Sequence, residues 1–181
     1  TFMKIASVQV DLDGVWAIRR CYGIQSAKPS DDDPVYAEGL ARFLELFKDL
    51  GVKATFFAVG LDAEVPWKAR LLKDAVSAGH EIANHSYTHS LDLASLTGYE
   101  LESEIDLAQR ALNSRVGVHP RGFRAPGYSL SGELLTLLDQ KGLIYDASLF
   151  PSRWGWLMRW VTRRLSRGGA STTQYGGGWN G

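Results

Sequence analysis

The sequence lacks several features on which other protein classes depend. Its single cysteine, Cys21, excludes an intrachain disulfide and is compatible with a reducing compartment. The sequence contains no run of 18 apolar residues, so it does not predict a membrane-spanning helix. No glycine pattern of the Rossmann or P-loop type is present. These absences favour an ordinary globular domain that has neither of these nucleotide-binding motifs.

The sequence as a whole has no excess of positive or negative charge, but its two parts differ in charge. The 181 residues contain equal numbers of acidic and basic side chains, so net charge gives no reason to expect a nucleic-acid partner. Residues 151–181, however, contain five arginines and no carboxylate, which leaves residues 1–150 with 15 basic and 20 acidic side chains. We therefore expect a domain over residues 1–150 and a different kind of segment over residues 151–181.

The segment 152–165, "SRWGWLMRWVTRRL", is both aromatic and basic. We favour a helix that packs on further parts of the domain, and the alternative is peripheral contact with an anionic membrane surface. The residues after it are rich in Gly, Ser and Thr and indicate a loop or tail. The opening "TFMKIASVQVDLDG" lacks the layout of a signal peptide, which predicts a cytoplasmic protein, with membrane association through 152–165 as the alternative.

Strand and helix patterns alternate along the first 150 residues. Such alternation with short connections predicts an α/β fold with a parallel sheet and right-handed crossovers. The predicted strands are 3–11, 52–60, 80–86, 122–127 and 143–150, and the predicted helices are 33–51, 66–79, 95–115 and 131–142.

Polar side chains occur where four of these strands end. Because the carboxyl ends of parallel strands meet at one edge of a sheet or one rim of a barrel, we expect these side chains to lie close together. They are Asp11 and Asp13 in "VDLDG", His85 and His89 in "NHSYTH", Arg124 in "FRAPGY" and Asp146 in "YDAS".

One carboxylate and two imidazoles form a typical ligand set for Zn²⁺ or a similar divalent ion. Such an ion makes hydroxide available near neutral pH. Residues two apart on a strand face the same side, so Asp11 and Asp13 can share a site, one as ligand and the other as base. Taken singly, "DLDG" is typical of a turn, Arg124 of a surface salt bridge and Asp146 of a loop cap. His80 begins its strand and is predicted to be structural, and His119 is predicted to face solvent.

These motifs resemble those of the polysaccharide deacetylases with the NodB homology domain, carbohydrate esterase family 4. "VDLDG", "HSYTH", "FRAPGYS" and "YDASLFPS" occur in the family's order, together with "TFFAVG" and "GHEIANHS". The resemblance covers roughly residues 4–152. It implies a distorted (β/α)7 barrel, here lacking its C-terminal strands, and metal-dependent removal of an N-acetyl group from a sugar or polysaccharide.

The resemblance also implies a role for each site residue. Asp11 becomes the base, Arg124 orients it, the Gly127 amide binds the oxyanion, and Asp146 tunes a histidine that acts as general acid. The implied ligands are Asp13, His85 and His89, holding one divalent metal, with zinc favoured and cobalt or nickel as alternatives.

The sequence departs from the family pattern after the fourth motif. It has no histidine after His119, and Gly127 stands where the family has tyrosine. We therefore favour part of a longer enzyme. The alternatives are a non-catalytic carbohydrate-binding or scaffold homologue and an amidase that acts on a small non-sugar amide.

Overall fold

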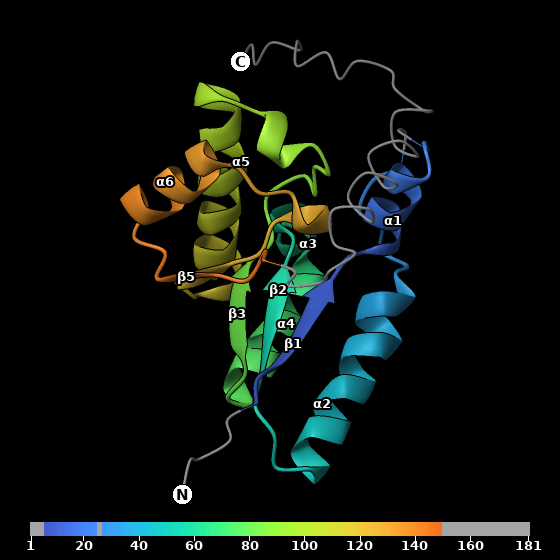
Figure 1. The fold of residues 1–181 in the computed structure, drawn as a ribbon. Helices are drawn as coiled ribbons and strands as arrows, with labels where there is room; N and C mark the ends of the chain where they lie inside the picture. The colour runs from blue at the N-terminus through green and yellow to red at the C-terminus, as the bar shows by residue number, and fades with distance from the viewer. Residues whose placement is uncertain (1–5, 25–26, 150–181) are drawn as a thin grey trace, which may run out of the picture.

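The protein, described here by a computed structural model covering residues 6–24 and 27–149, is built on one five-stranded parallel sheet (Figure 1). Each strand pairs with the next one along the chain, so the sheet curls as part of a barrel. The α/β class and the partial barrel predicted from the sequence are confirmed. The strands are β1 (Val8–Leu12), β2 (Ala54–Ala58), β3 (Glu81–Asn84), β4 (Gly122–Phe123) and β5 (Tyr145–Asp146).

Helical segments connect the strands and cover the outer face of the sheet (Figure 1). The described residues form three apolar clusters, one around Phe56 and Leu40, one around Phe123 and Ile105, and a small one around Trp16 and Val59. The segments are α1 (Val15–Cys21), η1 (Val35–Leu40), α2 (Ala41–Asp49), α3 (Gly60–Ala63), α4 (Pro66–Ser77), η2 (Leu93–Ser95), α5 (Gly98–Ala111), η3 (Leu112–Val116), η4 (Pro126–Tyr128) and α6 (Gly132–Gln140).

The strand register determines which side chains reach the concave face. Val10 pairs with Phe56, and Phe56 pairs with Ile82, and these side chains join the apolar cluster under the helices. The next position along each strand points the other way. Asp11 lies opposite Phe57 there, and both therefore face the inside of the partial barrel.

Several predicted boundaries are wrong. The strands predicted at 122–127 and 143–150 are only two residues long each, and the chain turns into η4 soon after β4. The sequence analysis also missed α1 and α3. The helix predicted at 33–51 begins with a π-helical segment before α2. Ser131 caps α6, since its hydroxyl accepts a hydrogen bond from Leu134 N–H at 3.2 Å.

The predicted second segment, residues 151–181 with its aromatic and basic stretch 152–165, lies outside the described residues. Its division from residues 1–150 therefore stays a prediction. Within residues 6–24 and 27–149, no helix is both long enough and apolar enough to cross a membrane.

Candidate metal centre

Three of the predicted residues converge at the carboxyl ends of β1 and β3. Asp13 Oδ1 lies 3.3 Å from His85 Nε2 and 3.1 Å from His89 Nε2. One potential ligand atom from each residue lies within 4.8 Å of the other two. Asp13 Oδ1 is buried and makes no hydrogen bond within the part of the chain that the structure describes. A buried carboxylate oxygen facing two imidazole nitrogens fits a divalent cation, and two imidazoles with one carboxylate suit zinc, cobalt or nickel.

A hydrogen bond fixes the orientation of the His85 ring. The Nδ1 atom of His85 lies 2.6 Å from the carbonyl oxygen of Arg124, to which it can donate only if Nδ1 carries the proton. That tautomer leaves a lone pair on Nε2, the nitrogen that faces Asp13. The arrangement is typical of a metal ligand whose second ring nitrogen is held by a backbone carbonyl.

The loop between the two histidines is held in an unusual conformation. Ser86 and His89 have φ angles of 61° and 58°, a region that non-glycine residues seldom occupy and that is often found at functional sites. Glu104 of α5 holds this loop, because its carboxylate accepts hydrogen bonds from the N–H groups of Tyr87 and Thr88 at 3.0 and 2.9 Å. It also accepts the Thr88 hydroxyl at 2.6 Å. The sequence analysis missed Glu104, which no local motif marks.

The close contacts among these side chains shift the pKa values of Asp13 and His89. Burial by itself would raise the pKa of Asp13, but the contacts with His85 and His89 outweigh it and hold that pKa well below its usual range. Burial by itself would lower the pKa of His89, but Asp13 and the neighbouring thiol of Cys21 outweigh it and raise that pKa. Helix α1 brings this cysteine beside His89. Without a metal, the site therefore favours a carboxylate beside a protonated imidazole.

Asp11 and Arg124 form an ion pair beside these ligands. Arg124 Nη1 donates to Asp11 Oδ1 at 2.7 Å, and Nε donates to the carbonyl of Ala147 at 3.1 Å. Arg124 Nη2 donates to Gln9 Oε1, and the guanidinium lies 4.2 Å from the centre of the Phe57 ring. The guanidinium is thus held on several sides and orients the Asp11 carboxylate through a charge-assisted hydrogen bond. The sequence analysis missed Gln9, which lies two residues before Asp11 and faces the same side.

Asp146 has a local role in the structure. Its two carboxylate oxygens accept hydrogen bonds from the backbone N–H and the hydroxyl of Ser148, at 3.1 and 2.5 Å. The Ser148 oxygen in turn accepts from Ala125 N–H at 2.8 Å. Asp146 therefore caps the loop after β5, which was one of the roles that the sequence allowed. Through Ser148 it also supports the segment after β4. The tuning of a histidine by Asp146 stays a prediction.

Gly127 lies in the turn η4 with φ 59°, a left-handed conformation that favours glycine. A Cβ atom at this position would lie 3.2 Å from Leu91 Cδ2. The turn places Gly127 directly after the Arg124–Pro126 segment, which carries the arginine of the site. Its role as an oxyanion donor stays a prediction.

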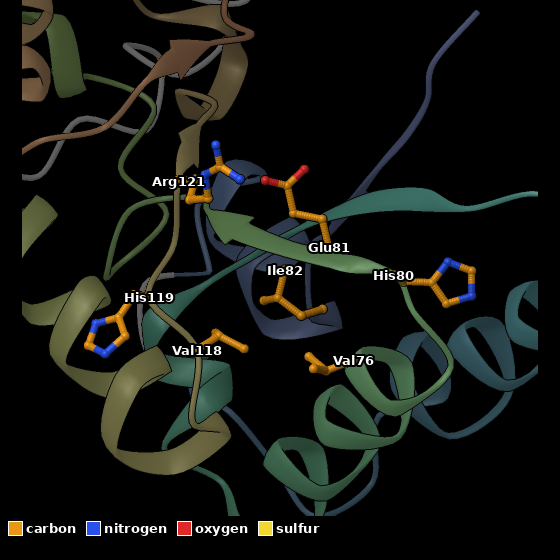
Figure 2. A pocket seen from close by; sticks show the side chains of 7 residues that line it. All are labelled: Val76, His80, Glu81, Ile82, Val118, His119 and Arg121. Atoms are coloured by element: carbon orange, nitrogen blue, oxygen red, sulfur yellow. The ribbon is translucent and has the colours of Figure 1, made fainter.

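The amino-terminal end of the sheet carries a separate pocket (Figure 2). The rings of His80 and His119 lie at opposite ends of it, with the apolar side chains of Ile82 and Val118 between them. His80 Nδ1 accepts a hydrogen bond from Ala54 N–H at 3.1 Å and its ring packs on Phe56, so its role is structural. The two histidines do not converge on a common point, and this pocket offers no metal site.

Comparison with known proteins identifies the family. The family model for polysaccharide deacetylases matches residues 30–145. The chain belongs to this family. It is 30% identical to a peptidoglycan deacetylase of Helicobacter pylori over 142 residues, which cover 77% of the chain and 47% of that protein. It is 33% identical over 135 residues to a chitooligosaccharide deacetylase of a Bradyrhizobium strain, covering 71% of the chain and 60% of that protein.

Solved structures agree with this assignment. A polysaccharide deacetylase homologue from Mycobacterium smegmatis matches with a TM-score of 0.64 and 26% identity, over 81% of this chain and 51% of that one. A carbohydrate esterase family 4 pseudoenzyme from Bacillus anthracis matches with a TM-score of 0.57 and 25% identity, over 77% of this chain and 42% of that one. The chain thus spans about half the length of these polysaccharide deacetylase relatives.

Proposed function

We propose that this chain carries the metal-binding half of a deacetylase that removes N-acetyl groups from an N-acetylated sugar or polysaccharide. The observation that carries the proposal is the convergence of Asp13, His85 and His89 beside the Asp11–Arg124 ion pair. A divalent ion held by the three ligands would polarise the acetamide carbonyl and make hydroxide available near neutral pH.

The residues around the ligands supply the remaining chemistry. Asp11, oriented by Arg124, takes the proton of the attacking water. The Gly127 amide donates a hydrogen bond to the developing oxyanion, a contact commonly worth about 3 kcal/mol in the transition state. Asp146 supports the loop that carries Arg124 and Gly127 through Ser148. We infer that the proton for the leaving amine comes from a group outside this chain, because no histidine follows His119 to match the general acid that the family resemblance implies.

The absence of that histidine favours a second candidate, a non-catalytic carbohydrate-binding homologue. Pseudoenzymes exist among the family's solved structures. An amidase for a small non-sugar substrate is a third candidate, since the same ligands would serve either amide. The cytoplasmic location and the contact of residues 152–165 with a membrane stay predictions.

Metal content tests the proposal directly. Wild-type protein incubated with Zn²⁺ and dialysed should retain about one equivalent by elemental analysis, as expected for one three-ligand site. His85→Ala should lose it, whereas the matched control His80→Ala should keep it because His80 lies at the other end of β3. Acetate release from N-acetylated glycans is the next assay. Zinc absent from the wild type, or retained equally in all three proteins, would reject this metal site.

A further inference from the structure

A second cluster of charged side chains lies fully buried next to the metal centre and takes no part in the proposed chemistry. Lys68 of α4 is completely inaccessible, and its Nζ lies 2.6 Å from Asp33 Oδ2 and 2.6 Å from Asp62 Oδ1. Asp33 lies two residues before η1, and Asp62 belongs to α3. Lys68 Nζ also lies over the ring of Tyr36, 4.7 Å from its centre.

The remaining hydrogen bonds of both carboxylates go largely to the residues that follow Asp13. Asp62 Oδ2 accepts from Gly14 N–H at 3.3 Å, and its Oδ1 accepts from the Trp16 indole N–H at 2.8 Å. Asp33 accepts from Val15 N–H at 3.2 Å. These bonds cap the start of α1. The helix needs such distant partners because its N-cap residue, Gly14, provides no side-chain hydrogen bond and its first turn contains no acidic residue.

The cluster also holds the chain on the other side of Asp13. The Tyr36 hydroxyl donates to the carbonyl of Leu12 at 3.4 Å. The backbone is therefore fixed at the residue before Asp13 and at the two residues after it. The Asp13 side chain then projects from this fixed segment toward His85 and His89.

A buried charge cluster of this kind is poor evidence of stabilisation, because the cost of desolvating three charges rivals their mutual attraction. Its contacts indicate a different role. We propose that Lys68, Asp33 and Asp62 are positioning residues that hold Asp13 at the correct place and angle to bind the metal. The inference rests on the proposed function only in that Asp13 is taken as a metal ligand.

Zinc affinity in the folded protein tests this role. Lys68→Met keeps an unbranched side chain that is one atom shorter and removes the charge. The two carboxylates then lose the cation that they share, and their hold on Gly14 and Val15 weakens. We expect zinc binding, measured by titration calorimetry, to weaken at least about tenfold, as found for groups that orient metal ligands. Phe47→Ala is the matched control, since Phe47 is buried against His80 at the far end of the sheet. Its zinc affinity should stay within about twofold of wild type despite lower stability.

Two outcomes would overturn the inference. Zinc affinity of Lys68→Met equal to wild type would do so, and so would an equal loss in Phe47→Ala. If Lys68→Met does not fold, Trp16→Phe replaces it, because this change removes one donor to Asp62 and leaves the charges in place. Its zinc affinity should then fall by more than that of Phe47→Ala, and an unchanged value would contradict the proposal. Wild-type protein that binds no zinc would instead reject the proposed function.

Discussion

The packing around Gly14 permits a sharp prediction about stability. A Cβ atom at Gly14 would lie 2.8 Å from Asp33 Oδ2 and 2.8 Å from each carboxylate oxygen of Asp62. These distances are too short for non-bonded contacts between carbon and oxygen. Gly14→Ala must therefore displace the carboxylates that bind Lys68. Overpacking typically costs about 1–3 kcal/mol, and breaking a buried ion pair costs about 3–5 kcal/mol.

We therefore expect Gly14→Ala to lower the free energy of unfolding by about 3 kcal/mol or more. Guanidinium unfolding of the metal-free protein would measure this, and the melting temperature should fall by roughly 6–12 °C. Gly132→Ala is the matched control, because no atom lies within 4 Å of a Cβ built there and its φ is not left-handed. That change should be neutral or stabilise by up to about 1 kcal/mol. If Gly14→Ala is as stable as the wild type, the charged cluster does not pack rigidly against this backbone.

Three further predictions follow from other contacts. Glu104→Ala leaves the N–H groups of Tyr87 and Thr88 without their acceptor, which should cost about 2–5 kcal/mol on unfolding by denaturant and weaken zinc binding. A metal must displace the proton of His89, whose pKa is raised above its ordinary 6.5, so zinc affinity should rise with pH through and above that value. Calorimetry in buffers of different ionisation enthalpy would detect the released proton, and its absence at pH 6 would contradict the shift. Lys141→Met removes a surface pair with Glu102 and Asp106 and should change the unfolding free energy by less than about 1 kcal/mol.

The residues that sequence analysis placed in the site share one property, which is proximity to a strand end. Asp13 follows β1 directly, and His85 follows β3, so recognising the strands was enough to predict that they meet. Arg124 was found in the same way after β4. The parallel order of the strands also followed from their alternation with helices.

The residues that hold these side chains in place could not be found this way. Asp62 binds Gly14 across 48 positions of the chain, and Glu104 binds Tyr87 across 17 positions. Helix α1 was missed for the same reason, since its capping groups are Asp33 and Asp62 and no residue of its own first turn signals a start. Such contacts depend on how helices pack on the sheet, which local patterns do not determine.

The supports of the candidate metal centre that the structure describes lie within residues 6–24 and 27–149. The charged cluster around Lys68 fixes the segment that carries Asp13, while Glu104 and the Arg124 carbonyl fix the loop and ring of the histidines. Neither support involves residues beyond the described part of the chain or the general acid of the proposed mechanism. Metal binding and turnover should therefore separate in this protein. If this chain binds zinc with ordinary affinity but releases no acetate, the defect lies in proton donation to the leaving amine. A completed barrel that supplies a histidine should then restore activity without changing the zinc affinity.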